Sequence, residues 1–150
     1  MLLISQNRRV SAMANDNEVV SGGCLCGKIR YECSAPAKAS GFCHCTTCQR
    51  ALGSAFGVWS AFGVDDVEIT KGQIKWYRSS DIARRGFCGD CGSPIAYVAD
   101  GSDTYYLWVG SLDKRDDLEL VGHWNAQSRL PWDDMQMDIP SYSEIFDDRG

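Results

Sequence analysis

The sequence contains no long apolar run. Its first apolar patch, Met1 to Ile4, is four residues long, and nothing later approaches the roughly 18 residues that span a bilayer. Arg8 and Arg9 follow this patch, whereas a secretory signal peptide carries its positive charge before the apolar region. We therefore expect no membrane segment, no secretion signal and a cytoplasmic protein.

An excess of basic residues is also missing. The 15 Lys and Arg residues are outnumbered by 20 Asp and Glu residues, so the formal net charge is −5. A negatively charged chain without a basic run is poorly suited to the phosphate backbone of nucleic acid. No G-x-G-x-x-G motif follows an expected strand and opens a helix. The sequence thus predicts neither a nucleic-acid partner nor a nucleotide cofactor.

Helical periodicity is scarce as well. Between Cys24 and Leu112, short runs rich in β-branched and aromatic residues alternate with Gly, Asp and Ser, a pattern typical of β-strands. The expected strands are Leu25–Cys33, Ser54–Phe62, Val67–Thr70, Ile74–Ser79, Arg84–Phe87, Pro94–Val98 and Thr104–Gly110. We expect helical turns at Thr46–Leu52 and Asp113–Leu118.

These patterns predict a mostly β, single small domain. A chain of 150 residues is long enough to bury a core without help from disulfides. Residues 1–20 are expected to form a flexible leader, and residues 21–150 to form the domain. From about residue 121 we expect an irregular aromatic tail packed over the β core.

Eight cysteines stand out against this ordinary composition. In a reducing compartment, closely spaced cysteines more often bind metal than form disulfides. Cys88 and Cys91 form a C-x-x-C pair, which supplies half of a tetrahedral zinc site. Cys24 and Cys26 are the simplest complement to this pair. The spacing therefore predicts a closed four-cysteine zinc site.

A second group of cysteines leaves a tetrahedron incomplete. Cys43, Cys45 and Cys48 give three thiolates within six residues and no obvious fourth ligand. An open fourth position is typical of a reactive zinc, and water or a substrate thiol would fill it. The alternative is a second structural zinc completed by His44 or Cys33. Cys33, however, alternates with Ile29 and Tyr31 as a core residue would, and His44 is expected to point away from the metal.

Three segments resemble the glutathione-dependent formaldehyde-activating enzyme family, which also includes centromere protein V. They are Gly22–Tyr31 (GGCLCGKIRY), Cys43–Arg50 (CHCTTCQR) and Phe87–Gly92 (FCGDCG). A later His123-Trp124, followed by Leu130-Pro131-Trp132, is similar to the C-terminal segment of that family. The resemblance covers roughly residues 21–92 together with this later segment, and the N-terminal leader lies outside it.

The resemblance implies a β-tent fold with two zincs per chain. Cys24, Cys26, Cys88 and Cys91 would be the structural ligands. Cys43, Cys45 and Cys48 would hold a catalytic zinc whose open side faces a small thiol. The implied activity is that of a carbon–sulfur lyase, which joins formaldehyde to the sulfur of glutathione and gives S-hydroxymethylglutathione. The alternative function is a non-catalytic zinc module that mediates binding.

Substrate contacts are predicted at two further positions. Arg50, just beyond the last cysteine of the cluster, is expected to anchor an anionic substrate through a charge-assisted contact. Trp124 is expected to line the cleft. The neighbouring Arg84 and Arg85 are interpreted as a solvated pair on an edge strand. We expect a small-molecule thiol partner, and the sequence indicates no particular oligomeric state.

Overall fold

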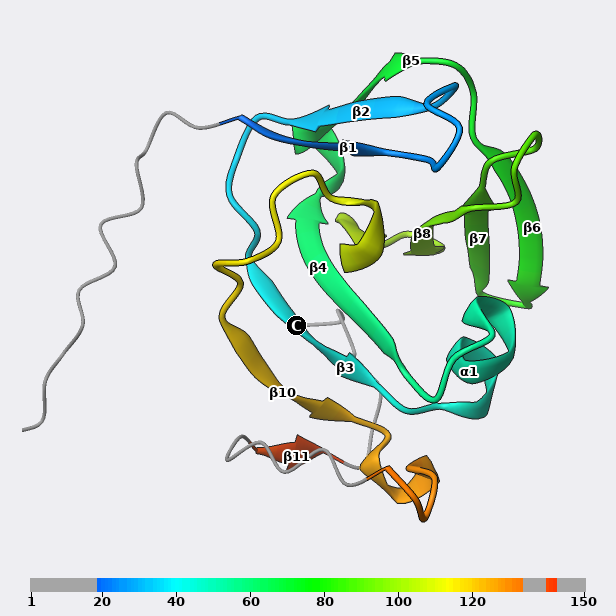
Figure 1. The fold of residues 1–150 in the computed structure, drawn as a ribbon, viewed down its shortest axis with the longest axis vertical. Coiled ribbons are helices and arrows are strands. Elements are labelled where there is room, and N and C mark those ends of the chain that lie inside the picture. The colour runs from blue at the N-terminus through cyan, green and yellow to red at the C-terminus, as the bar shows by residue number, and fades with distance from the viewer. Residues whose placement is uncertain (1–18, 134–139, 143–150) are drawn as a thin grey trace, which may run out of the picture.

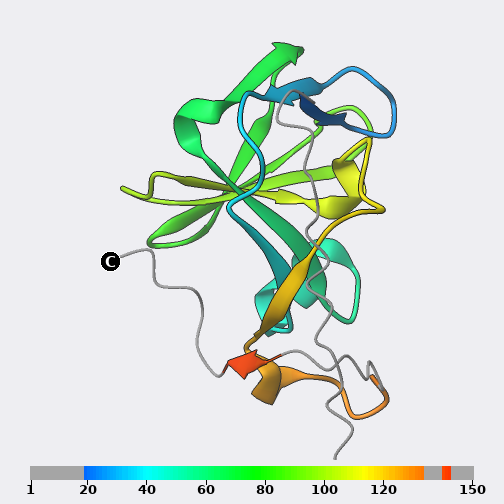
Figure 2. The same cartoon turned by 90° about the vertical axis from the view of Figure 1, so that its left-hand side faces the viewer.

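Two β-sheets form the body of the protein in the computed structural model, which describes residues 19–133 and 140–142 (Figure 1). The smaller sheet has the order β1-β2-β5, with all pairs antiparallel. Its strands are β1 (Val20–Gly23), β2 (Arg30–Cys33) and β5 (Val67–Lys71). Figures 1 and 2 place this sheet at one end of the molecule.

The larger sheet has eight strands in the order β11-β10-β3-β4-β9-β8-β7-β6. Its pairs are antiparallel except for β10, which runs parallel to both β3 and β11. The strands are β3 (Ala39–Cys43), β4 (Gly57–Gly63), β6 (Lys75–Ser80), β7 (Ala83–Phe87), β8 (Pro94–Ala99), β9 (Thr104–Trp108), β10 (Leu120–Trp124) and β11 (Ser141–Tyr142). The fold class is therefore mostly β, as predicted.

The helix α1 (Thr46–Leu52) follows β3 directly and has the predicted bounds. Three short 3-10 turns complete the described elements: η1 (Val64–Asp66), η2 (Val109–Ser111) and η3 (Ala126–Ser128). The second expected helical turn, Asp113–Leu118, is wrong, because no helix forms there. In the ranges 19–133 and 140–142, no helix has the length and apolar character needed to cross a bilayer.

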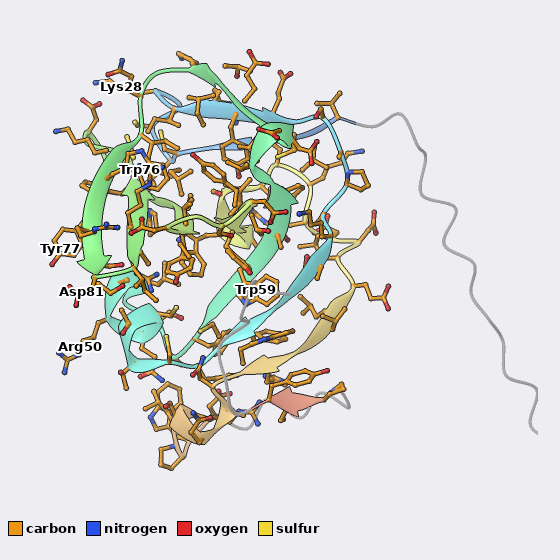
Figure 3. The ribbon with its side chains drawn as sticks, turned by 180° about the vertical axis from the view of Figure 1, so that it is seen from behind. Lys28, Arg50, Trp59, Trp76, Tyr77 and Asp81 are labelled. Carbon is orange, nitrogen blue, oxygen red and sulfur yellow. The ribbon has the colours of Figure 1, made fainter. Side chains whose placement is uncertain are left out.

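The hydrophobic core has two parts. One joins the small sheet to the large sheet and includes Tyr31, Phe62, Ile95 and Leu107, all with no more than 1% of their surface exposed. The other is aromatic and surrounds the middle cysteines; its buried aromatic members are Trp59, Tyr106, Trp108 and Trp124. Trp59 lies inside the ribbon in Figure 3. Burial of such rings supplies much of the stability of a small domain.

Several expectations about the strands need correction. The expected strand Leu25–Cys33 begins only at Arg30, because residues 24–28 turn to present cysteines. β3 was not predicted at all. The expected irregular tail from about residue 121 starts inside β10, whose last residue, Trp124, pairs with Cys43. β7 is an interior strand between β6 and β8, so the edge-strand interpretation of Arg84 and Arg85 is wrong.

Two of the predictions involve residues that the structure does not describe. Of the expected leader, residues 1–18 lie outside the described ranges, and β1 already begins at Val20. The expected tail includes residues 134–139 and 143–150, which also lie outside them.

Candidate metal centre

Four cysteine sulfurs meet where β1 and β7 end. Cys24 and Cys26 lie in the turn after β1, and Cys88 and Cys91 lie in the turn after β7. All four Sγ atoms are within 4.8 Å of one another. The Cys24 and Cys26 sulfurs are 3.5 Å apart, and the Cys26 and Cys88 sulfurs are 3.8 Å apart. The sequence-based pairing of these two motifs agrees with the arrangement in space.

Backbone hydrogen bonds hold the two turns of this four-cysteine cluster in place. The Ile29 backbone N–H donates to Cys24 Sγ at 3.2 Å. Gly92 closes the second turn with an N–H···O bond to Cys88 of 2.9 Å and has φ +76°. This left-handed conformation favours glycine, since a Cβ would be strained there. A soft divalent ion with four thiolate ligands fits such a set.

The second cluster comes from one short segment. Cys43 is the last residue of β3, Cys45 is the N-cap of α1, and Cys48 lies in the first turn of that helix. Their sulfurs also lie within 4.8 Å of one another, and no fourth His, Cys, Asp or Glu joins them among the residues that the structure describes. The three-cysteine cluster thus has the donor set predicted for an open metal site.

Each sulfur of the three-cysteine cluster faces a different nitrogen donor. The Cys48 backbone N–H donates to Cys45 Sγ at 3.3 Å, and Arg85 Nη2 donates to Cys48 Sγ at 3.5 Å. Asn125 Nδ2 donates to Cys43 Sγ at 3.8 Å. Donors of this kind around a metal ligand orient it and tune its electron density.

Sequence reasoning missed both side-chain donors. Asn125 is 82 residues from the cysteine that it contacts, so no local motif links them. Its φ of +54° is the one positive value at a non-glycine position in the described part of the chain. A strained conformation is a recognised mark of functional sites, although it is visible only in the structure. Arg85 was noted in the sequence but interpreted as solvated.

Some of the sulfurs in each cluster lose their proton more readily than an ordinary thiol, because the pKa values of Cys45, Cys91 and Cys24 are lowered. The pKa of the Cys45 thiol is lowered to about 2, because Cys43 and then Cys48 donate S–H hydrogen bonds to it. The pKa of Cys43 is raised in turn by these S–H bonds to its two neighbours and by burial. In the other cluster, the hydroxyl and backbone N–H of Ser93 lower the pKa of Cys91 to about 5. Thiolates that form this readily are good metal ligands.

Arg85 is more closely associated with the cluster than Arg50 is. Its guanidinium carbon is 5.0 Å from the centre of the Tyr97 ring and 5.8 Å from that of Trp108. Arg50 is exposed at the end of α1 and projects away from the body of the protein (Figure 3). Arg50 is exposed to solvent, and its role as an anion anchor stays a prediction.

Trp124 lies in the aromatic part of the core, where it is 7% exposed. Its ring meets Trp59 edge-on, with 4.8 Å between ring centres, and stacks on Tyr142 at 5.1 Å. It is the register partner of Cys43 across the β3–β10 pair. Trp124 is therefore beside the cluster, and its predicted contact with substrate stays a prediction.

His44 and Cys33, the two alternative ligands, belong to neither cluster. The His44 side chain is fully buried and points to His123, with 2.9 Å between its Nε2 and the Nδ1 of His123. Its Nδ1 is 3.4 Å from Asp133 Oδ2. Cys33 is 1% exposed in the core beneath the small sheet. Both positions agree with the structural interpretation favoured for these residues.

A pocket of about 740 Å³ lies beside the four-cysteine cluster, with Cys24 in its lining. Leu52 and Trp108 also line it, and both pack in the hydrophobic cluster that contains Cys43 and Cys48. None of Cys43, Cys45 and Cys48 is among the lining residues. Arg30 and Arg115 supply basic groups to the same lining. The pocket thus combines apolar walls with a few charged groups, which is common in small-molecule sites.

Comparison with known proteins agrees with this geometry. An "Uncharacterized lyase C29B12.13" of Schizosaccharomyces pombe is 30% identical over 87 residues, a match that covers 57% of this chain and 63% of that relative. A crystal structure of a Rhodobacter sphaeroides protein shares the fold with a TM-score of 0.55 and 18% identity, over 81% of this chain and 99% of that one. The family described as "Glutathione-dependent formaldehyde-activating enzyme" matches residues 19–127. The chain, with both of its cysteine clusters inside the matched range, belongs to this family.

Proposed function

We propose that the protein is a zinc-dependent carbon–sulfur lyase that forms or breaks the S-hydroxymethyl adduct of a glutathione-like thiol and formaldehyde. The observation that carries this proposal is the three-cysteine cluster, which has three converging sulfurs and no fourth ligand among the described residues. Membership of the family and the similarity to an uncharacterized lyase of Schizosaccharomyces pombe support a lyase. The match covers 63% of that relative, so the activity of this chain is a proposal.

The reaction itself needs few groups. The thiol sulfur bonds to the aldehyde carbon, the carbonyl π bond breaks, and the thiol proton is transferred overall to the new hydroxyl oxygen. A zinc ion held by Cys43, Cys45 and Cys48 would supply a Lewis-acidic position for the incoming thiol. The aromatic residues around the cysteines exclude water from this side of the cluster.

The rest of the substrate would occupy the pocket of about 740 Å³. A glutathione-like thiol carries carboxylates, which match a lining that includes Arg30 and Arg115. The Arg30 guanidinium is already paired with Asp113, whereas Arg115 is exposed and donates from Nη1 to the Gly110 and Leu112 carbonyls. Arg115 is therefore the better placed of the two to accept a carboxylate.

Metal analysis combined with thiol titration tests the proposal. We expect about two zincs per chain in the wild type and about one in Cys43→Ser, with loss of glutathione binding and of formaldehyde consumption in that variant. Cys33→Ala is the matched control, since it removes a cysteine that belongs to neither cluster, and it should keep both zincs. Two zincs with no response to any thiol would instead favour the non-catalytic zinc module, and absence of zinc would contradict both functions.

A further inference from the structure

The three-cysteine cluster creates a charge problem when it holds a metal. A divalent ion with three thiolates carries a net charge of −1, and a fourth thiolate would make it −2. Cys43 and Cys48 are only 8% and 5% exposed, and Cys45 is half-buried, so water screens this charge incompletely. Buried charge without a partner is costly. A cation close to the sulfurs therefore stabilises such a centre.

Arg85 has the properties of that cation. Its Nη2 lies 3.5 Å from Cys48 Sγ, while its Nε and Nη1 are buried and have no hydrogen-bond partner. No carboxylate in residues 19–133 or 140–142 forms an ion pair with it. The rings of Tyr97 and Trp108 hold the guanidinium in place. A buried guanidinium without a carboxylate is stable only where another negative charge compensates it.

The four-cysteine cluster provides a contrast within the same chain. Two of its cysteines, Cys24 and Cys88, are also buried, but Cys26 is exposed. The charge on this cluster is therefore partly screened by solvent. Lys28, which lies close to it, is paired with Asp90 at 2.7 Å on the surface. Among the described residues, Arg85 is the cation without a carboxylate partner that contacts a cysteine sulfur, and that sulfur belongs to the three-cysteine cluster.

We propose that Arg85 is a positioning residue that compensates the charge of the three-thiolate metal centre and so favours an anionic thiolate as its fourth ligand. This inference rests on the proposed function for the identity of that ligand, but the effect on metal binding does not depend on catalysis. It predicts that removal of the charge at position 85 weakens the three-cysteine centre selectively. It also predicts that thiolate binding suffers more than the binding of a neutral ligand.

The test compares Arg85→Met, Arg85→Lys and the matched control Arg84→Met. Arg84 is the preceding residue on β7, but it is exposed and lies over Trp76 at 4.6 Å, a ring outside the hydrophobic cluster that contains Cys43 and Cys48. Competition with a chromophoric chelator measures zinc affinity for each centre. Cobalt-substituted protein reports the fourth ligand through its absorption spectrum, with glutathione as the anionic ligand and imidazole as the neutral one.

For Arg85→Met we expect zinc affinity to fall roughly 10–100-fold at the three-cysteine centre, with the four-cysteine centre unchanged. Glutathione binding should fall at least tenfold more than imidazole binding. Arg85→Lys should restore part of both losses, and Arg84→Met should behave as wild type. Wild-type zinc affinity in Arg85→Met, or equal losses for glutathione and imidazole, would overturn the proposal. If the wild type binds no thiol while Arg85→Met still loses zinc selectively, the proposed lyase function fails and charge compensation by Arg85 stands.

Discussion

His44 Nε2 lies 2.9 Å from His123 Nδ1, although the two residues are 79 positions apart in the sequence. Both side chains are buried, and Arg129 Nη2 lies 3.0 Å from the same His123 nitrogen. His44 itself stands between Cys43 and Cys45. The pair therefore links the residue between Cys43 and Cys45 to β10.

Replacement of His123 by phenylalanine should destabilise the protein by about 1–3 kcal/mol. The ring could still stack on Phe42, which His123 now meets with 4.8 Å between ring centres, but His44 would lose its buried partner. Urea unfolding measures the change, and Tyr77→Phe at an exposed position serves as the control. A loss below about 0.5 kcal/mol would show that the imidazole pair contributes little to stability.

The same pair predicts acid sensitivity. Burial, followed by the charge of Arg129, lowers the pKa of both histidines below the ordinary value of 6.5. The unfolded chain therefore binds protons at a higher pH than the folded chain does, so stability is complete above about pH 6.5 and falls as the pH drops below it. Unfolding free energies between pH 7.5 and 5.5 should show this slope. His123→Phe should have a shallower slope, and an equal slope in both proteins would contradict the assignment.

Asn125→Gly and Asn125→Ala should separate backbone strain from the contact with Cys43. Both variants lose the Nδ2 donor, so zinc affinity at the three-cysteine centre should fall by about tenfold in each. Only glycine adopts the observed φ of +54° without strain. Asn125→Ala should therefore be about 1 kcal/mol less stable than Asn125→Gly. Equal stabilities of the two variants would mean that the backbone relaxes to avoid the strain. Unchanged zinc affinity would show that the Asn125 amide does not affect metal binding.

Cys33 should resist alkylation in the folded protein. Burial, followed by the charge of Asp66, raises the pKa of its thiol to about 12, so its thiolate is scarce at pH 8. Mass spectrometry after iodoacetamide treatment should show Cys33 unmodified without denaturant and modified with it. The raised pKa also means that the contribution of this thiol to stability is present below its ordinary pKa of 9.0 and is lost as the pH rises toward 12. Rapid labelling of folded protein at pH 8 would contradict this.

Removal of metal from the four-cysteine cluster should destabilise the whole fold by several kcal/mol. This cluster joins the turn after β1 to the turn after β7, and binding energy at such a site contributes to folding. Thermal unfolding with and without a strong chelator measures the effect. Cys26→Ser should reproduce it, whereas Cys43→Ser should lose mainly the other metal. An equal effect of the two variants on the unfolding temperature would argue against a structural role specific to this cluster.

The metal donor sets could be predicted from the sequence because the ligands lie in short motifs. Spacing alone grouped Cys24 and Cys26 with Cys88 and Cys91, and the cluster geometry agrees. The bounds of α1, Thr46–Leu52, were also predicted, and the structure shows that Cys45 caps this helix. The side-chain donors on the sulfurs come from Arg85 and Asn125, which depend on strand pairing across the large sheet. No local pattern carries that information.

The strand β3 was not predicted because its sequence also depends on tertiary packing. Its sequence, ASGFC, is rich in small residues with weak strand preference. A Cβ at Gly41 would lie 2.5 Å from the Trp124 ring and 3.0 Å from the Trp59 ring. Glycine is needed there because two large rings pack across the strand, and those rings arrive from β4 and β10. Gly41 therefore weakens the strand preference of this segment, yet the packing of the two tryptophan rings requires it.

The two clusters also differ in how far apart their ligands lie along the chain. Cys43, Cys45 and Cys48 are neighbours at the junction of one strand and one helix, whereas Cys26 and Cys88 are 62 residues apart. Closing the short segment around an ion costs little chain entropy, and closing the long one costs more unless the sheets have already brought its ends together. The three-cysteine site can therefore be assembled by one local segment, whereas the four-cysteine site needs the fold to bring the turns after β1 and β7 together.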